Sequence, residues 1–152
     1  MCYEIRQAEL RDIAVCAQIE ANSFSEPWSE RSLTEAIQNE NALFYVLSMN
    51  DNIVGYYVAE NICDEINLYT IAVTDSSKGK GYGKALLSHL INKAKTMKAV
   101  FIGLEVRVSN LIAISLYEKN GFLKSGTRKA FYKKPVEDAH LYTLLLNYED
   151  QQ

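Results

Sequence analysis

The residues best suited to chemistry lie in a stretch of interleaved glycine and lysine, Lys78–Lys84, between the apolar run Leu68–Val73 and a periodic helix pattern. The glycines are Gly79, Gly81 and Gly83, and the lysines are Lys78, Lys80 and Lys84. Glycine lets the backbone approach a ligand closely and allows positive φ. The first turn of a helix adds N–H groups without intrahelical partners and the positive end of the dipole. This stretch therefore predicts a site for the diphosphate of a phosphorylated cofactor.

Two common phosphate-binding motifs fit this stretch poorly. A Walker loop has Gly-x-x-x-x-Gly-Lys-Ser/Thr, whereas Lys84 is followed by Ala85 and the glycine spacing differs. A dinucleotide fingerprint has Gly-x-Gly-x-x-Gly and an acidic residue about 20 positions on. Here Lys84 takes the place of the third glycine, and Glu105 is a loose match for the acid. A tight strand-to-helix turn that binds nothing stays an alternative.

A second polar group begins where an apolar strand pattern ends, at Glu105 and Arg107. Charge at a buried-type strand is unusual because unpaired charge in a core is costly. These side chains either leave the sheet to pair with other charges or line the mouth of a site, where open sheets bind ligands. Tyr117 follows Asn110 by two helical turns, so both can face one groove. Taken alone, Tyr117 is better explained as a core aromatic residue.

Composition limits the classes of function. The 152 residues suit a single domain, 1–152, and a net charge of −3 provides no general basic field for binding nucleic acid. No apolar run is long enough to span a membrane, and the N-terminal residues lack the apolar core of a signal peptide. We therefore expect a cytoplasmic protein without direct nucleic-acid or membrane binding.

The cysteines and histidines predict no metal site. Cys2, Cys16 and Cys63 are far apart in the sequence and form no Cys-x-x-Cys pair, so they are expected to be reduced thiols. His89 and His140 have no clustered ligand partners.

The hydrophobic patterns predict a mixed α/β domain that is not doubly wound. Apolar periodicity predicts helices at 10–21 and 82–97. Capping signals predict two more, one after Ser29 through about 38 and a short one after Ser109 or Asn110 through 119. Strands are expected at 3–7, 44–49, 53–61, 65–73, 100–106, from 122 and at 140–147, with a hairpin turn at 50–52 and a loop containing Pro135.

These motifs together resemble a known family. Ile71-Ala-Val73, Lys78-x-x-Gly81-x-Gly83, Asn110 and Leu116-Tyr117-x-x-x-Gly121-Phe122 are similar to the acetyl-CoA motifs of the GCN5-related N-acetyltransferases. Within that superfamily, the segments 27–30, 104–110, 113–117 and 128–132 resemble the RimI-type ribosomal-protein alanine N-acetyltransferases. The likeness covers nearly the whole chain, and 105–122 is its more specific part. Two departures are Lys78, where relatives usually carry Gln or Arg, and 74–77, where they often carry a proline and an aromatic residue.

The resemblance implies one mixed, mostly antiparallel twisted sheet of about seven strands flanked by about four helices, splayed at the central parallel strands. It implies acetyl-CoA as cosubstrate, with no metal. The implied cofactor contacts are Ile71, Ala72, Val73, Lys78, Gly79, Lys80, Gly81, Tyr82, Gly83, Lys84, Asn110 and Tyr117.

The resemblance also assigns roles in direct attack by an amine on the thioester. Glu105 corresponds to the general base and Tyr117 to the general acid, while backbone N–H groups near Ala72 and Val73 would polarise the carbonyl. An α-amine costs about 1 kcal/mol to neutralise at pH 7, and a lysine side chain several times as much, so a single carboxylate suits an N-terminus. The implied substrate-side residues are Trp28, Arg107 and Tyr132, although Trp28 could equally anchor its loop.

Three activities are compatible with this pattern. The favoured one is acetylation of the N-terminal α-amine, with alanine first, of a ribosomal protein. A second is acetylation of a small amine or of a lysine side chain on the same fold. A third is a non-catalytic acetyl-CoA-binding module, which the presence of both Glu105 and Tyr117 argues against. The oligomeric state, monomer or weak dimer, is left open by the sequence.

Overall fold

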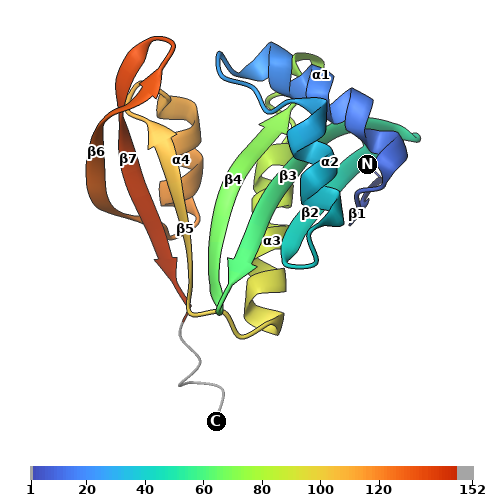
Figure 1. Ribbon diagram of the computed structural model, residues 1–152. Helices are drawn as coiled ribbons and strands as arrows, with labels where there is room; N and C mark the ends of the chain where they lie inside the picture. The colour runs from blue at the N-terminus through green and yellow to red at the C-terminus, as the bar shows by residue number, and fades with distance from the viewer. Residues whose placement is uncertain (1, 147–152) are drawn as a thin grey trace.

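The computed structural model describes residues 2–146, which fold into one mixed sheet with helices on both faces (Figure 1). The strand order in this part of the chain is β1-β2-β3-β4-β5-β7-β6. The strands are β1 (Tyr3–Gln7), β2 (Ala42–Met49), β3 (Asn52–Ile62), β4 (Glu65–Val73), β5 (Phe101–Arg107), β6 (Leu123–Lys133) and β7 (Val136–Leu145). The helices are α1 (Ile13–Ser23), α2 (Glu30–Gln38), α3 (Tyr82–Thr96) and α4 (Leu111–Lys119). The predicted fold class is confirmed.

The centre of the sheet is its one parallel pair among the described strands, β4 with β5. This pairing covers only four residues on each strand, from Glu65 opposite Phe101 to Leu68 opposite Leu104. Beyond it β4 continues beside β3 and β5 continues beside β7, so the two halves of the sheet diverge. Figure 1 shows the two strands spreading apart toward the upper edge. The predicted splay at the central strands is therefore present.

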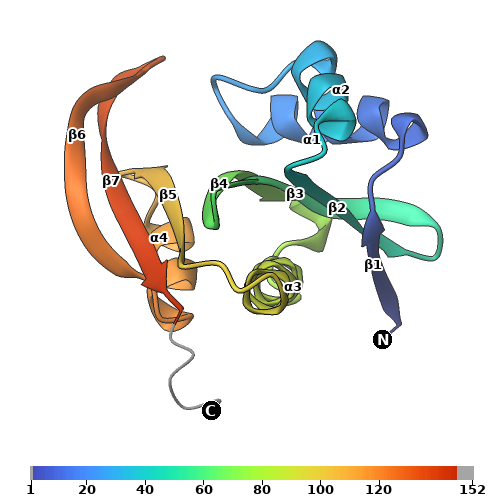
Figure 2. The same ribbon diagram turned by 60° about the horizontal axis from the view of Figure 1, so that its bottom comes forward.

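Two hydrophobic layers hold the sheet between the helices (Figure 2). One lies under α1 and α2, where Cys16, Ile19 and Leu33 pack on the β2 and β3 side chains Val46 and Val58. The other lies against α3 and α4, whose buried residues include Leu86, Leu87, Leu90 and Tyr117. Alternate residues of each strand point to opposite faces, which lets β2 and β3 contribute to both layers.

Local sequence signals set several element ends. Ser29 caps α2, with its Oγ accepting the Ser32 N–H at 3.1 Å, and Asn110 caps α4, with its Oδ1 accepting the Ala113 N–H at 3.2 Å. Gly121 follows α4 with a φ of 91°, as a helix C-terminus often requires. No helix in residues 2–146 is both long and apolar enough to cross a membrane.

The C-terminal hairpin is longer than the sequence predicted. β6 extends to Lys133 and β7 begins at Val136, so most of the segment expected to be a loop before residue 140 is strand. Charged residues interrupt the apolar alternation here because β6 is an edge strand with one side in solvent. The predicted last strand reached Asn147, which lies outside the described residues. The first helix also differs, since it opens with a 3-10 turn at Leu10–Asp12.

Candidate active site

The glycine and lysine stretch forms an open turn between β4 and α3. Gly79 and Gly81 have φ values of 79° and 83°, and a Cβ added to either would meet no atom within 4 Å. Gly81 is the N-cap of α3, while Gly83 already lies inside the helix. Positive φ is therefore needed at two of the three glycines, and the space beside both is open for a ligand.

Three lysines surround this turn. Lys78 forms an exposed ion pair with Asp75, with Nζ 2.9 Å from Oδ1, while Lys80 and Lys84 form no ion pair within the described part of the chain. The Tyr82 ring is buried and packs edge-on against Tyr3, so it belongs to the core. An open backbone turn, a helix start and lysine side chains fit the diphosphate of acetyl-CoA.

The diverging part of β4 carries Ile71, Ala72 and Val73. Each pairs with a β3 residue on one side, and none pairs with β5 on the other. Because the backbone groups of a strand point alternately to its two edges, this segment presents some of its N–H and C=O groups to the gap. The predicted site for polarising a carbonyl thus lies on an unpaired strand edge.

Glu105 is the first β5 residue beyond the last pair with β4, so it lies where the gap opens. Its side chain is 33% exposed, and its Oε1 is 3.9 Å from the Arg128 guanidinium. Tyr69 holds the matching place on β4. Burial, the hydrogen bond to Glu60 and the nearby charges of Glu60 and Glu105 raise the pKa of Tyr69 to about 12. A carboxylate and a protonated phenol thus flank the opening.

Tyr117 lies in α4 with only 6% of its surface exposed, and its ring packs at 5.7 Å from that of Phe122. Burial, with a smaller contribution from Tyr132, raises the pKa of Tyr117 well above its usual value of 10. The hydroxyl is therefore a protonated donor at neutral pH. Asn110 starts the same helix, and its side-chain oxygen is engaged in the helix cap.

Tyr132, on β6, interacts electrostatically with both Glu105 and Tyr117. The pKa of Tyr132 is raised to about 12, mainly by burial and next by the negative charge of Glu105. The positive charge of Arg107 lowers this pKa and partly offsets the rise. Tyr132 in turn perturbs Tyr117. The charge of Glu105 thus acts on both Tyr69 and Tyr132, and Tyr132 acts on Tyr117.

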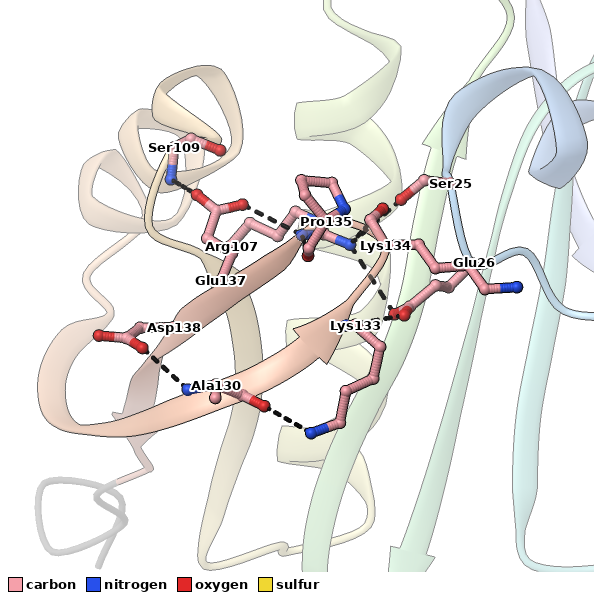
Figure 3. A network of polar contacts seen from close by, with 10 residues as sticks. All are labelled: Ser25, Glu26, Arg107, Ser109, Ala130, Lys133, Lys134, Pro135, Glu137 and Asp138. Carbon is pink, nitrogen blue, oxygen red and sulfur yellow. Dashed lines mark hydrogen bonds and ion pairs between the residues drawn. The ribbon is translucent and has the colours of Figure 1, made fainter.

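Arg107 joins two loops at this end of the sheet (Figure 3). Its Nη1 donates to the Glu137 carboxylate at 3.1 Å and to the Pro135 carbonyl at 3.0 Å. Its Nη2 donates to Ser25 Oγ at 3.1 Å and to the Lys134 carbonyl at 3.2 Å.

Glu26 completes the connection. Its Oε1 accepts the Lys133 N–H at 2.8 Å, and its Oε2 lies 3.8 Å from Arg107 Nη2. The α1–α2 loop is thereby tied to the tip of the β6–β7 hairpin.

Trp28, in the α1–α2 loop, is half-buried and lines a groove between α2 and the β3–β4 surface. Its ring lies 5.7 Å from that of Tyr69, tilted by 36°. Its backbone N–H donates to the buried Glu20 carboxylate at 3.4 Å, and Thr70 donates to the same carboxylate. The structure is therefore compatible with both interpretations of Trp28, as a loop anchor and as a substrate-side residue, because it anchors its loop and also faces open space.

Sequence reasoning missed Tyr69 and Glu20. Tyr69 could have been found as the polar position of β4 level with Glu105, once the parallel pairing was assumed. Glu20 lies on the buried face of α1 with Ile13 and Cys16, and a carboxylate at that spacing indicates a buried polar partner.

Comparison with known proteins identifies the family. The model of the acetyltransferase (GNAT) family matches residues 13–122. The [ribosomal protein bS18]-alanine N-acetyltransferase of Salmonella typhimurium is 35% identical over 129 residues, covering 85% of each chain. That of Haemophilus influenzae is 37% identical over 131 residues, covering 86% of this chain and 88% of its own. The resemblance to RimI-type enzymes is confirmed.

Solved structures of other proteins support the same family assignment. The crystal structure of the Escherichia coli ribosomal-protein-S18-alanine N-acetyltransferase superposes with a TM-score of 0.89 at 32% identity, covering 96% of this chain and 95% of its own. Ard1 from Thermoplasma volcanium shares the fold, with a TM-score of 0.90 at 22% identity, covering 97% and 99%. The chain belongs to the acetyltransferase (GNAT) family and is an acetyl-CoA-dependent N-acetyltransferase.

Proposed function

We propose that this enzyme acetylates the N-terminal α-amine of a ribosomal protein that begins with alanine. The names of the relatives at 35% and 37% identity support this substrate. The observation that carries the proposal is the place of Glu105, a partly exposed carboxylate on the first β5 residue beyond the paired segment. An amine that enters the gap where β4 and β5 diverge would find this carboxylate at the opening.

Glu105 acts as the general base in this proposal. An α-amine has a pKa of ~7.7–8.0 and is mostly protonated at pH 7, so it must lose a proton before it can attack. The Glu105 carboxylate accepts that proton, directly or through one water. Its exposure supports this role, because the proton must afterwards pass to solvent.

Tyr117 acts as the general acid. Acetyl-CoA supplies the thioester carbon that the amine attacks, and Tyr117 holds a proton for the departing sulfur. With its pKa above 10, the hydroxyl is protonated at neutral pH, so a proton is present when the sulfur departs. Backbone N–H groups between Ile71 and Val73 would stabilise the negative oxygen that forms on attack, because they lie on an unpaired edge of β4.

The cofactor contacts follow from the open turn. Gly79 and Gly81 leave space for the diphosphate, and Lys78, Lys80 and Lys84 neutralise its charge. Gly83 and Tyr82 would contribute through the backbone at the start of α3. Asn110 would position the cofactor from the start of α4.

Arg107 and Tyr132 act on the substrate side by shaping the acceptor entrance. Arg107 donates four hydrogen bonds to groups of its own chain, which supports a positioning role rather than direct binding of the peptide. Trp28 would line the entrance from the opposite loop.

A peptide panel tests the proposal. Peptides that differ only in the first residue, each with one internal lysine, are incubated with acetyl-CoA beside free polyamines, and products are located by mass spectrometry. We expect α-acetylation, fastest with alanine first. A lysine side chain in the same peptide should react far more slowly, because neutralising it costs about 3–4 kcal/mol more than neutralising the α-amine. Preferential ε-acetylation, or faster use of a polyamine, would assign the enzyme to the lysine or small-amine alternative.

A further inference from the structure

The groove beside Trp28 has a volume of about 480 Å³ and is lined by both aromatic and acidic side chains. Its walls come from the α1–α2 loop, α2, β3 and β4. The lining residues used below are Trp28, Glu35, Asn39, Glu60 and Tyr69. Two aromatic rings and two carboxylates thus face one space.

Glu60 is the carboxylate that is held in place. Its Oε1 accepts the Tyr69 hydroxyl at 2.6 Å, and its Oε2 accepts the Asn39 amide at 2.7 Å. These hydrogen bonds hold the pKa of Glu60 below its usual range, so the group is ionised at neutral pH. Within residues 2–146 no lysine or arginine forms an ion pair with it, whereas Glu35 at the rim is paired with Arg31. Each Glu60 oxygen keeps acceptor capacity for a further donor.

An ionised carboxylate beside two aromatic rings favours a cation. The face of a tryptophan or tyrosine ring attracts an ammonium or guanidinium, and the carboxylate supplies a charge-assisted hydrogen bond. Trp28 and Tyr69 are tilted by 36° at 5.7 Å, so one side chain can touch both rings. The long apolar stem of lysine or arginine also matches the apolar part of the lining.

Tyr69 connects the groove with the proposed acceptor site. It lines the groove, and the pairing of Leu68 with Leu104 places it level with Glu105 on the same face of the sheet. An extended peptide advances ~3.3–3.6 Å per residue, so positions two to four lie within about 11 Å of the N-terminal residue. Glu60 pairs with Asn67, so it lies two strands from β5 and two residues before the level of Glu105, about 12 Å away by strand geometry. A long side chain at one of these positions would therefore reach Glu60 while the α-amine is at Glu105.

We propose that this groove binds a lysine or arginine side chain located two to four residues into the acceptor peptide, and so selects basic N-termini. The inference rests on the proposed function, because it assumes a peptide whose α-amine is at Glu105. Glu60 supplies the charge, and Trp28 and Tyr69 supply the aromatic faces.

Matched peptides test the selectivity. Each is a six-residue peptide that begins with alanine and is otherwise uncharged in its side chains, with either arginine or glutamine at position two, three or four. At one of these positions, kcat/KM for the arginine peptide should exceed that for the glutamine peptide about tenfold, mainly through KM. In Glu60→Gln this ratio should fall to near one.

Glu40→Gln is the control. It removes the same unit of charge from an exposed residue that does not line this groove, so it should keep the arginine preference. All rates are compared at one ionic strength, since long-range attraction between exposed charges depends on salt. A ratio near one at all three positions in the parent enzyme, or a preference that survives Glu60→Gln, would overturn the proposal.

A binding measurement separates this inference from the proposed function. Trp28 is the sole tryptophan of the chain, so intrinsic tryptophan fluorescence reports directly on the groove. Peptides already acetylated at the N-terminus are titrated into the enzyme, and the arginine form should bind about tenfold more tightly than the glutamine form, in a manner that depends on Glu60. If this response is found while no peptide is acetylated, the proposed function fails and the cation site stands. If peptides are acetylated without this response, the cation site alone is wrong.

Discussion

The guanidinium of Arg107 lies over the Tyr132 ring, with its central carbon 4.2 Å from the ring centroid. The same guanidinium donates to the β6–β7 hairpin tip and to Ser25 in the α1–α2 loop. A planar group can satisfy several acceptors at its edge while its face stacks on an aromatic ring. One residue of β5 thereby fixes the relative position of the two loops that border the proposed acceptor entrance.

Replacing Arg107 by lysine should therefore disturb the use of peptide more than that of cofactor. Lysine keeps the charge but loses the planar fork and the stacking, so the two loops separate more readily. We expect the KM for peptide to rise about tenfold and the KM for acetyl-CoA to change less than about twofold. Steady-state kinetics with each substrate varied in turn measures both values.

Arg6→Lys provides the control for general destabilisation. Arg6 also makes a bidentate contact, with Asp12 at 2.8 and 2.9 Å, but it lies on the edge strand β1, four strands away from β5. Both variants should melt at a lower temperature, and only Arg107→Lys should raise the KM for peptide. An equal rise in Arg6→Lys would mean that Arg107 merely stabilises the fold.

Substitution at Gly81 should weaken acetyl-CoA binding. In Gly81→Val a branched side chain resists the φ of 83° and fills the open space beside the turn. We expect the Kd for acetyl-CoA, measured by calorimetry, to rise at least about tenfold. Gly121→Ala is the matched variant, because it also places a side chain at positive φ but at the end of α4. Unchanged affinity in a folded Gly81→Val protein would remove the turn from the cofactor site.

The pH dependence of turnover should lack a contribution from Tyr117 near its usual pKa. Burial raises the pKa of this hydroxyl above 10, so the acid form persists as the pH rises through that value. The parent enzyme should therefore show no loss of kcat between pH 8 and about 10. Tyr117→Phe should reduce kcat by ~10²–10⁴ over the same range, as expected for a lost general acid. A descending limb near pH 9 in the parent would place the acid elsewhere.

Several strands, helix caps and the glycine turn of this site could be predicted from the sequence, because their conformations depend on residues close by in the chain. Tyr3–Gln7 and Glu65–Val73 were predicted with their observed bounds, and the caps at Ser29 and Asn110 follow from side chains a few residues away. The strand-to-helix turn at 78–84 could be predicted because the start of a helix and the conformations of glycine depend on neighbouring residues.

Long-range relationships could not be predicted in the same way. Lys133 and Glu26 are 107 positions apart, and nothing in either segment alone indicates that they meet. The β6–β7 hairpin was underestimated because an edge strand accepts charge on its exposed side and thus lacks the apolar alternation of a central strand. The groove at Glu60 depends on α2 packing beside β3 and β4, which no single motif encodes.

The decisive variant for the proposed chemistry is Glu105→Gln. Glutamine keeps the size of the side chain but accepts no proton at neutral pH, so kcat at pH 7 should fall by ~10²–10⁴. Affinity for acetyl-CoA should stay the same, because Glu105 lies on β5 and the glycine turn follows β4. The deficit should shrink as the pH rises past ~8, since the α-amine then loses its proton without help. Rates from pH 6 to 10, with calorimetry and thermal melting at pH 7, test all three expectations. Full activity at pH 7, or loss of the folded state, would make Glu105 a structural charge.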